Sequence, residues 1–325
     1  MSQVSKRSES AFIRQIAIMI NSDYVLLTAA CNEEKFITKT IESVVNQTIS
    51  PQRWVIVSDG SIDRTDDIVR DYAERYHFIQ FVRREKITGR DFSAKVLALQ
   101  KGFQLLADVN YSFYCTLDAD VSFQPDYFKI ILTKFCENPK LGIAGGIRLN
   151  YCNDKFRKEI VSLSNVVGSV QFFRRECFES AGGFVPSKIG GEDTILEIRA
   201  KKNGWIVQSF QELQIYHYRT TGSAEGFLLK SRYRDGIADY CLGNPIFFEF
   251  FKCCRRLTQR PYLIGSVMTF CGFTVSFFKE PEKFLSNDEI EFVKRYQLKK
   301  IKNWVYQRLR FLSRCMGSHR ICSFE

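Results

Sequence analysis

Short apolar segments alternate with longer amphipathic segments through the first 120 residues of this chain. Strand-like runs of four to six residues occur at 24–28, 54–57, 78–82 and 112–117. Helix-like runs of twelve to fourteen residues separate them, at 35–46, 65–76 and 93–106. This alternation is typical of βαβ units, whose strands form a sheet covered by helices. We therefore predict an α/β fold with a mostly parallel central sheet flanked by helices.

Acidic side chains follow three of these strands, at the sheet edge where open α/β sheets bind ligands. Glu33 follows the first strand and Asp59 the second, while Asp118 and Asp120 follow the strand at 112–117. Because alternate residues of a strand share a face, Asp118 and Asp120 can approach one divalent cation. Mg2+ and Mn2+ prefer oxygen ligands and usually share them with substrate phosphates. The pair therefore indicates a phosphate-bearing substrate.

Turn chemistry offers a structural alternative for each of these groups, since Asp-x-Asp and Asp-Gly-Ser sequences also cap helices and form turns. It does not explain why acids recur after three of the four strands. No Gly-x-Gly-x-x-Gly follows the first strand, and no Gly-x-x-x-x-Gly-Lys-Ser/Thr occurs anywhere. Their absence disfavours a Rossmann dehydrogenase and a P-loop NTPase. A phosphate site built from carboxylates and a metal remains.

Taken in order, the motifs resemble those of the family 2 glycosyltransferases, which have the GT-A fold. The resemblance covers about residues 23–220. It rests on Asn32-Glu33-Glu34, Ser58-Asp59-Gly60-Ser61, Lys95, Asp118-Ala119-Asp120, Gly182-Gly183-Phe184 and Glu192-Asp193-Thr194. A fainter likeness at 217–219 and 232–240 is to bacterial enzymes that build surface polysaccharides. The resemblance implies a metal-dependent, inverting transfer of sugar from a nucleoside diphosphate sugar to a hydroxyl of a saccharide or lipid-linked acceptor.

The resemblance also implies roles in donor binding. Asp59 would bind the base, Glu33 the ribose, and Asp120 would be the direct ligand of Mn2+ or Mg2+, with Asp118 between ribose and metal. The implied nucleotide-sugar contacts are Ala29, Cys31, Glu33, Asp59, Ser61, Lys95 and Asp118. Ala29 and Cys31 stand where the family more often has proline and an aromatic residue. This departure leaves the base open among uracil, guanine and thymine.

Asp193 is the implied general base, and Glu192 is the alternative. A carboxylate whose pKa is raised by partial burial can take the proton of an acceptor hydroxyl as the oxygen attacks the anomeric carbon. The Gln-x-x-Arg-Trp motif that marks processive polymerases does not follow this pair. The resemblance therefore implies transfer of a single sugar.

Two further residues are possible contacts of the diphosphate. His217 lies in a strand-like segment, where a histidine is more often structural, and the resemblance favours an approach to the diphosphate. Arg232 could clamp phosphate in forked geometry, although an arginine on a basic segment is usually only solvated.

The positive charge of the chain is concentrated in its last quarter. The whole sequence has 47 basic and 36 acidic residues, a formal net charge of +11, and residues 252–325 contain 15 basic and 6 acidic ones. A basic appendage of this kind typically binds nucleic acid or anionic lipid. Its apolar content favours lipid, so we expect contact with an anionic membrane surface and no nucleic-acid partner.

Residues 262–278 form an uncharged run of seventeen residues. At about 1.5 Å per residue, such a helix barely crosses a hydrocarbon core of roughly 30 Å. An interfacial or re-entrant helix is therefore expected, followed by a basic amphipathic helix over 290–312. A helix packed on the protein's own core is the alternative for this tail.

These features predict three parts: an N-terminal extension at 1–22, a GT-A domain at 23–245, and a basic, partly apolar helical tail at 246–325. Single cysteines in apolar runs and a polar N-terminus without a signal-peptide pattern indicate a cytoplasmic protein. With the tail, they predict a peripheral protein on the inner face of the cell membrane.

Two alternatives of other classes remain at this stage. A nucleotidyltransferase also joins an α/β sheet to paired carboxylates, but a Gly-rich basic loop would follow its first strand. A catalytically silent nucleotide- or lipid-binding protein could keep the sheet, but the acids expected to be lost from it are all present.

Overall fold

The computed structural model describes residues 23–85, 93–152, 154–186, 190–219, 228–258 and 261–318, with the side chains of 305 and 307–318 excepted. The chain divides into two compact units, 1–223 and 224–325. Residues 224–245, which the domain limits proposed from the sequence place in the first part, belong to the second unit.

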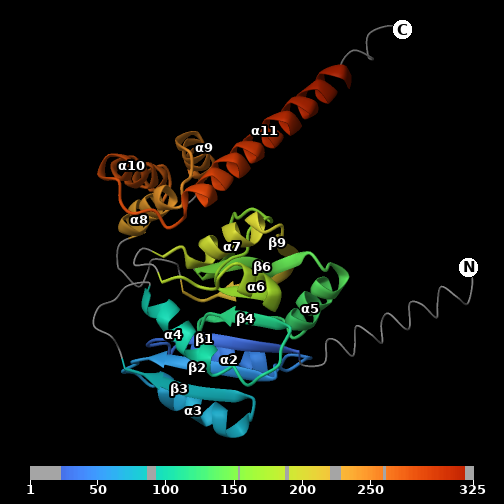
Figure 1. Cartoon of the computed structure of the whole chain (residues 1–325), viewed down its shortest axis with the longest axis vertical. Coiled ribbons are helices and arrows are strands. Elements are labelled where there is room, and N and C mark those ends of the chain that lie inside the picture. The colour runs from blue at the N-terminus through green and yellow to red at the C-terminus, as the bar shows by residue number, and fades with distance from the viewer. Residues whose placement is uncertain are drawn as a thin grey trace, which may run out of the picture. The chain divides into compact units, whose positions relative to one another are not determined.

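The first unit is built on a mixed nine-stranded sheet (Figure 1). Its strand order is β3-β2-β1-β4-β8-β6-β9-β5, and β7 pairs with β6. The strands are β1 (Tyr24–Ala30), β2 (Arg53–Asp59), β3 (Ile79–Arg84), β4 (Phe113–Leu117), β5 (Val121–Phe123), β6 (Leu141–Cys152), β7 (Lys155–Lys158), β8 (Val170–Arg174) and β9 (Ile206–His217).

The first four strands of this order are parallel, as the βαβ pattern predicted, and β8 is antiparallel to both of its neighbours. The strands and helices predicted within residues 24–117 are confirmed to within two residues at each end.

Helices cover both faces of this sheet. They are α2 (Ile37–Val45), α3 (Thr65–Arg75), α4 (Ser93–Gln104), α5 (Tyr127–Glu137), α6 (Arg175–Ser180) and α7 (Glu192–Lys202). Because alternate residues of a strand point to opposite faces, Tyr24 and Leu26 join the core under α2, α3 and α5, and Val25 and Leu27 join the core under α4, α6 and α7. The predicted α/β class is confirmed.

Glycines permit two irregularities near the later strands. A Cβ at Gly146 would lie 2.5 Å from the Leu213 carbonyl oxygen, and the pairing of β6 with β9 shifts register at this point. Gly182 and Gly183 have φ angles of 78° and 65° in the turn after α6, a conformation that side chains rarely adopt.

The second unit is helical, with α8 (Leu228–Cys241), α9 (Ile246–Arg256), α10 (Ile264–Lys279) and α11 (Asn287–Ser318). The helices predicted over 262–278 and 290–312 are therefore confirmed as helices. Within the described parts of the chain, no helix combines the length and the apolar character needed to cross a membrane.

The backbones of α8 and α10 approach each other closely. A Cβ at Gly236 would lie 1.9 Å from the Thr269 carbonyl oxygen, and one at Gly272 would lie 2.0 Å from that of Tyr233. Small residues at such a crossing allow two helices to pack main chain against main chain.

Candidate active site

The loops after β1 and β2 are tied together by side-chain hydrogen bonds. The Asn32 amide donates to Ser61 Oγ at 3.2 Å, and the Ile62 amide donates to Asn32 Oδ1 at 2.9 Å. Asn32 has a φ of 56°, which asparagine tolerates better than most residues. Ser61, predicted as a nucleotide-sugar contact, is buried and holds these two loops in place.

Asp59 and Arg84 form a buried pair at the carboxyl ends of β2 and β3. The two residues are register partners, and Arg84 Nε lies 3.0 Å from Asp59 Oδ1. Nevertheless, the angles are not those of a hydrogen bond: among the described residues, neither atom has a hydrogen-bond partner, nor does Arg84 Nη2. Buried polar atoms almost always have partners. Two donor atoms of Arg84 and one acceptor atom of Asp59 are therefore available to hydrogen-bond the edge of a planar nucleotide base.

Asp118 forms an ion pair with Lys95 of α4. Lys95 Nζ lies 2.7 Å from Asp118 Oδ1. Burial alone raises the pKa of Asp118, but the charge of Lys95 outweighs it and the pKa falls below the ordinary value. Burial lowers the pKa of Lys95, but Asp118 and Glu192 outweigh this effect and raise it. Both groups are therefore charged at neutral pH.

Asp120 lies between β4 and β5 and meets residues from the end of β9. The antiparallel pairing of Val121 with His217 brings His217 Nε2 to 3.5 Å and Arg219 Nε to 3.8 Å from Asp120 Oδ2. Burial and the charge of Asp118 raise the pKa of Asp120 to about 6.

Arg219 also reaches Glu33, where its Nη2 lies 2.6 Å from Glu33 Oε2. Burial, followed by the charge of Asp120, raises the pKa of Glu33 to about 8 despite this arginine. The ends of β1, β4 and β9 thus meet at one group of charges.

His217 is held in one tautomer by a neighbouring amide. Its Nδ1 lies 2.9 Å from Asn150 Oδ1, which accepts hydrogen bonds and cannot donate them. Burial, and then the positive charge of Arg148, lowers the pKa of His217 to about 4, so the ring is neutral at pH 7. With the proton on Nδ1, the lone pair of Nε2 faces Asp120 Oδ2. Two acceptor atoms so close are stabilised by a proton or a cation between them.

Asp193 and Asp118 both contact the turn that precedes β8. The Asp118 amide donates to the Ser169 carbonyl at 2.9 Å. A Cβ at Gly168 would lie 2.5 Å from Asp193 Oδ2, so only glycine leaves room for that carboxylate. Asp193 Oδ1 accepts the Thr194 amide at 2.7 Å, near the start of α7. Burial and the charge of Asp193 raise the pKa of Glu192.

The remaining predicted residues lie in different places. Ala29 is in β1, in register with Val57 of β2, and Cys31 follows β1. Arg232 is on α8 in the second unit, where its Nη1 lies 3.3 Å from Asp235 Oδ2. The structure therefore brings Glu33, Asp118 and Asp120 together and links Asp118 through Lys95 to Glu192 and Asp193. Asp59 lies with Arg84, and Arg232 belongs to the other unit.

Three arginines of this site received no role from the sequence: Arg84, Arg148 and Arg219. Arg84 ends β3, and the rule that sites gather at the ends of parallel strands could have found it. Arg148 lies in β6, which the strand pattern had not identified. Arg219 was noted only within a motif.

The described residues hold no group of three His, Cys, Asp or Glu side chains arranged to bind a metal ion. A cation here would need further ligands from outside this set. Asp120 Oδ2 and the neutral His217 Nε2 are the protein atoms best placed to bind such a cation. Both are acceptors, and they lie 3.5 Å from each other.

Comparison with solved structures identifies the fold as that of GT-A glycosyltransferases. A mannosyltransferase from Pyrobaculum calidifontis, in complex with GDP-Man and Mn2+, superposes with a TM-score of 0.51 at 14% identity. The match covers 79% of this chain and 74% of that one. S. aureus TarS in complex with UDP-GlcNAc also superposes with a TM-score of 0.51, at 13% identity. That match covers 79% of this chain and 73% of the TarS chain.

Sequence comparison gives the family. Residues 26–181 match the family described as Glycosyl transferase family 2. A poly-beta-1,6-N-acetyl-D-glucosamine synthase of Staphylococcus epidermidis is 29% identical over 45% of this chain, and the probable glycosyltransferase YdaM of Bacillus subtilis is 27% identical over 57%. The aligned parts span 31% and 48% of those proteins' own lengths. The resemblance inferred from the motifs is confirmed, since residues 26–181 match the family 2 glycosyltransferase model.

Proposed function

We propose that this chain transfers a single sugar from a nucleoside diphosphate sugar to an acceptor hydroxyl, with inversion at the anomeric carbon. The observation that carries the proposal is that Asp118 and Asp193 both lie against the turn at 168–169. One end of this site suits a diphosphate and its cation, and the other suits a general base. The mannosyltransferase and TarS structures hold nucleotide sugars, which supports a donor of this class.

The donor nucleotide would lie along the ends of β2, β1 and β4. Asp59 and Arg84 would hydrogen-bond the edge of the base with their unsatisfied buried atoms. Glu33 would accept hydrogen bonds from the ribose. Its raised pKa means that it can also donate a hydrogen bond when protonated.

A divalent cation, Mn2+ or Mg2+, would be held by Asp120 and His217, with Asp118 nearby. The fit rests on the two facing acceptor atoms and on the Asn150 hydrogen bond that fixes the histidine tautomer, the usual arrangement behind a metal-bound imidazole. When bound, such a cation stabilises the negative charge that develops on the leaving diphosphate.

Asp193 would accept the acceptor's proton. As the hydroxyl oxygen bonds to the anomeric carbon, the bond from that carbon to the diphosphate oxygen breaks and the proton passes to the carboxylate. The Thr194 amide and the space left by Gly168 position this carboxylate. Lys95, between Asp118 and the acids at the start of α7, would balance their charges.

The test is a thermal-shift and hydrolysis screen of UDP-, GDP- and dTDP-sugars with Mn2+, Mg2+ or EDTA. We expect nucleotide sugars with one of the three bases to raise the unfolding temperature of the protein. A ligand at 100 times its Kd adds about 2.7 kcal/mol to the free energy of unfolding. Asp120→Asn should remove the metal dependence, and the exposed Asp126→Asn is the matched control. If no nucleotide sugar shifted the transition with either metal, the proposal would be wrong.

We also propose that the second unit binds the surface of an anionic membrane, on the cytoplasmic side. Large apolar side chains on α9 and α10 face solvent, among them Phe247 at 71% exposure, Phe250, Leu263, Ile264 and Val267. Arg255 and Arg256 lie in the last turn of α9. Exposed aromatic and aliphatic side chains next to cations are typical of interfacial helices.

Vesicle flotation tests this proposal with the full chain. We expect binding to phosphatidylglycerol-containing vesicles, weaker binding at high salt, and a loss of about tenfold in the Phe247→Ser/Phe250→Ser variant. Ile62→Ser, which removes a side chain 90% exposed in the first unit, is the control. Equal flotation of wild type and double variant would contradict the proposal.

A further inference from the structure

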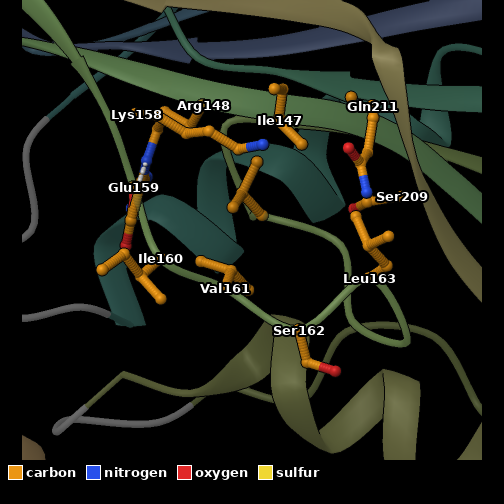
Figure 2. Close-up of a pocket in the computed structure, with 12 residues that line it drawn as sticks. Ile147, Arg148, Lys158, Glu159, Ile160, Val161, Ser162, Leu163, Ser209 and Gln211 are labelled. Carbon is orange, nitrogen blue, oxygen red and sulfur yellow. Dashed lines mark hydrogen bonds and ion pairs between the residues drawn. The ribbon is translucent and has the colours of Figure 1, made fainter. Parts of the chain in front are cut away.

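A pocket of about 280 Å³ lies against the middle of β6 and β9 and the end of β7. In Figure 2, Arg148, Lys158 and Glu159 line one wall and Ser209 and Gln211 line the opposite one. Between these walls lie apolar side chains: Ile147, Ile160, Val161, Leu163 and Val167. The volume is at the small end of the range for ligand pockets.

An irregularity in the sheet forms one wall of this pocket. Gly146 pairs with Phe210, but the next residue, Ile147, pairs with Gln214, so residues 211–213 bulge out of β9. The missing side chain at Gly146 leaves room for the Leu213 carbonyl. Bulges of this kind often lie beside functional sites, where they redirect side chains.

The opposite side of the pocket is fixed to the helix that carries Asp193. Glu197 of α7, which is 2% exposed, accepts hydrogen bonds from the Val166 amide at 2.6 Å and from Asn165 Nδ2 at 2.8 Å. Ser209 of β9 holds the same segment, because its Oγ donates to the Asn165 carbonyl at 2.7 Å. The pocket therefore keeps a set position relative to the proposed base.

The polar wall is connected to the other end of the active site. Glu159 lies 2.6 Å from Arg148 Nε and accepts a hydrogen bond from Asn150 Nδ2 at 3.2 Å. The same Asn150 holds His217, which faces Asp120. Hydrogen bonds thus link the pocket to His217 and to the helix that carries Asp193, and none of the proposed donor-binding residues lines it.

Its apolar residues are unusually exposed for a loop. Ile160 is 52% exposed, Val161 38% and Leu163 39%. Three partly exposed aliphatic side chains within four residues, lining a pocket beside a reaction centre, favour a ligand with an apolar part. The polar walls suit sugar hydroxyls, but a free sugar would leave the aliphatic side chains between them without an apolar partner.

We propose that this pocket binds the apolar group to which the acceptor sugar is attached, so that the acceptor is a saccharide on an alkyl-type chain. The chain would lie against Ile160, Val161 and Leu163, and the sugar hydroxyl would face Asp193. This inference rests on the proposed function and selects the lipid-linked class of acceptor over the free saccharide.

The test compares n-octyl and methyl β-D-glucopyranoside, below the micelle concentration, by titration calorimetry on the full chain. Burying two methylene groups corresponds to roughly tenfold in affinity. We therefore expect the octyl glycoside to bind at least about tenfold more tightly. Val161→Ser and Leu163→Ser should remove most of that difference while leaving the unfolding temperature unchanged, because both side chains are partly exposed.

Two controls separate this site from others. Val185→Ser changes an aliphatic side chain of similar exposure in the same unit, and Phe247→Ser changes the apolar surface of the second unit. Neither should alter the octyl advantage. The proposal would be overturned if the octyl glycoside bound no more tightly than the methyl glycoside. It would also be overturned if the difference in affinity were lost in Phe247→Ser but retained in Val161→Ser. The stabilisation by nucleotide sugar and Mn2+ is measured separately, so its presence or absence shows whether the proposed function itself fails.

Discussion

Helices α5 and α10 bury opposite kinds of side chain. In the first unit, α5 buries Tyr127, Phe128, Ile131, Leu132 and Phe135 against the sheet. In the second unit, α10 buries mainly small or polar residues, Gly265, Ser266, Thr269, Gly272 and Ser276, with Phe273 as the exception. Its large apolar residues, among them Ile264, Val267, Phe277 and Phe278, are exposed.

This contrast indicates that different interactions stabilise the two units. The first is held by burial of large apolar side chains, the main source of stability in water. The second joins α8 to α10 through close backbone contact and leaves apolar surface outside, as helices do where lipid is the neighbour. It also buries an ion-pair network in which Lys252 contacts Asp239 and Glu249.

The largest effect we expect concerns the sugar transfer, which the proposed function places in the first unit. Asp193→Asn should lower turnover by about 10² to 10⁴-fold, the range for loss of a general base, with donor binding unchanged. Gly168→Ala should also lower turnover, because its Cβ would displace Asp193 Oδ2. Steady-state kinetics and nucleotide titration measure both. Phe247→Ser should leave donor hydrolysis unaltered, and a comparable loss there would break the division between units.

Core truncation should separate the two kinds of aromatic residue. Phe128 is fully buried between Tyr24 and Phe172. Phe128→Ala should therefore lower the free energy of unfolding by about 3–5 kcal/mol. Phe247→Ala should change the free energy of unfolding by no more than about 0.5 kcal/mol, because the ring is exposed in the folded state. Urea unfolding followed by hydrogen exchange in each unit measures both. Equal destabilisation would remove the contrast.

The second unit should become less stable as pH rises. Burial, and then Asp239, raises the pKa of Glu249 from 4.5 to about 7. Between these values the folded unit binds more protons than the unfolded chain, so the free energy of unfolding falls by about 2–3 kcal/mol from pH 4.5 to 7 and then levels off. Hydrogen exchange of α9 at several pH values measures this. Glu249→Gln should flatten the profile, and an unchanged slope would assign the dependence to another group.

The smallest effect concerns the helix crossing. Gly272→Ala places a Cβ 2.0 Å from the Tyr233 carbonyl oxygen and should destabilise the second unit by about 1–3 kcal/mol. Ser266→Ala in the same helix is the control, because its buried Oγ has no hydrogen-bond partner among the described residues. Its loss should be neutral or slightly stabilising. Thermal unfolding compares the two, and similar values would show that close backbone contact does not order this unit.

Local patterns predicted much of the first unit. The alternation of apolar runs identified the parallel part of the sheet, because hydrophobic period depends only on neighbouring residues. The same reading missed β6 and β8, whose pairing with distant strands makes the sheet mixed. It also placed the acids at strand ends, where the structure has them.

What the amino-acid order determined by itself was the set of segments and the chemical types at their ends: carboxylates after successive strands, and a basic, apolar C-terminal part. Only the tertiary structure decided the partners. Glu33 and Arg219 lie 186 residues apart in the sequence and meet only in the folded structure, where β9 pairs with β5 and ends near Asp120. Which face α10 buries was likewise decided by its contact with α8. Periodicity is a property of neighbouring residues, whereas register and packing depend on residues far away along the chain.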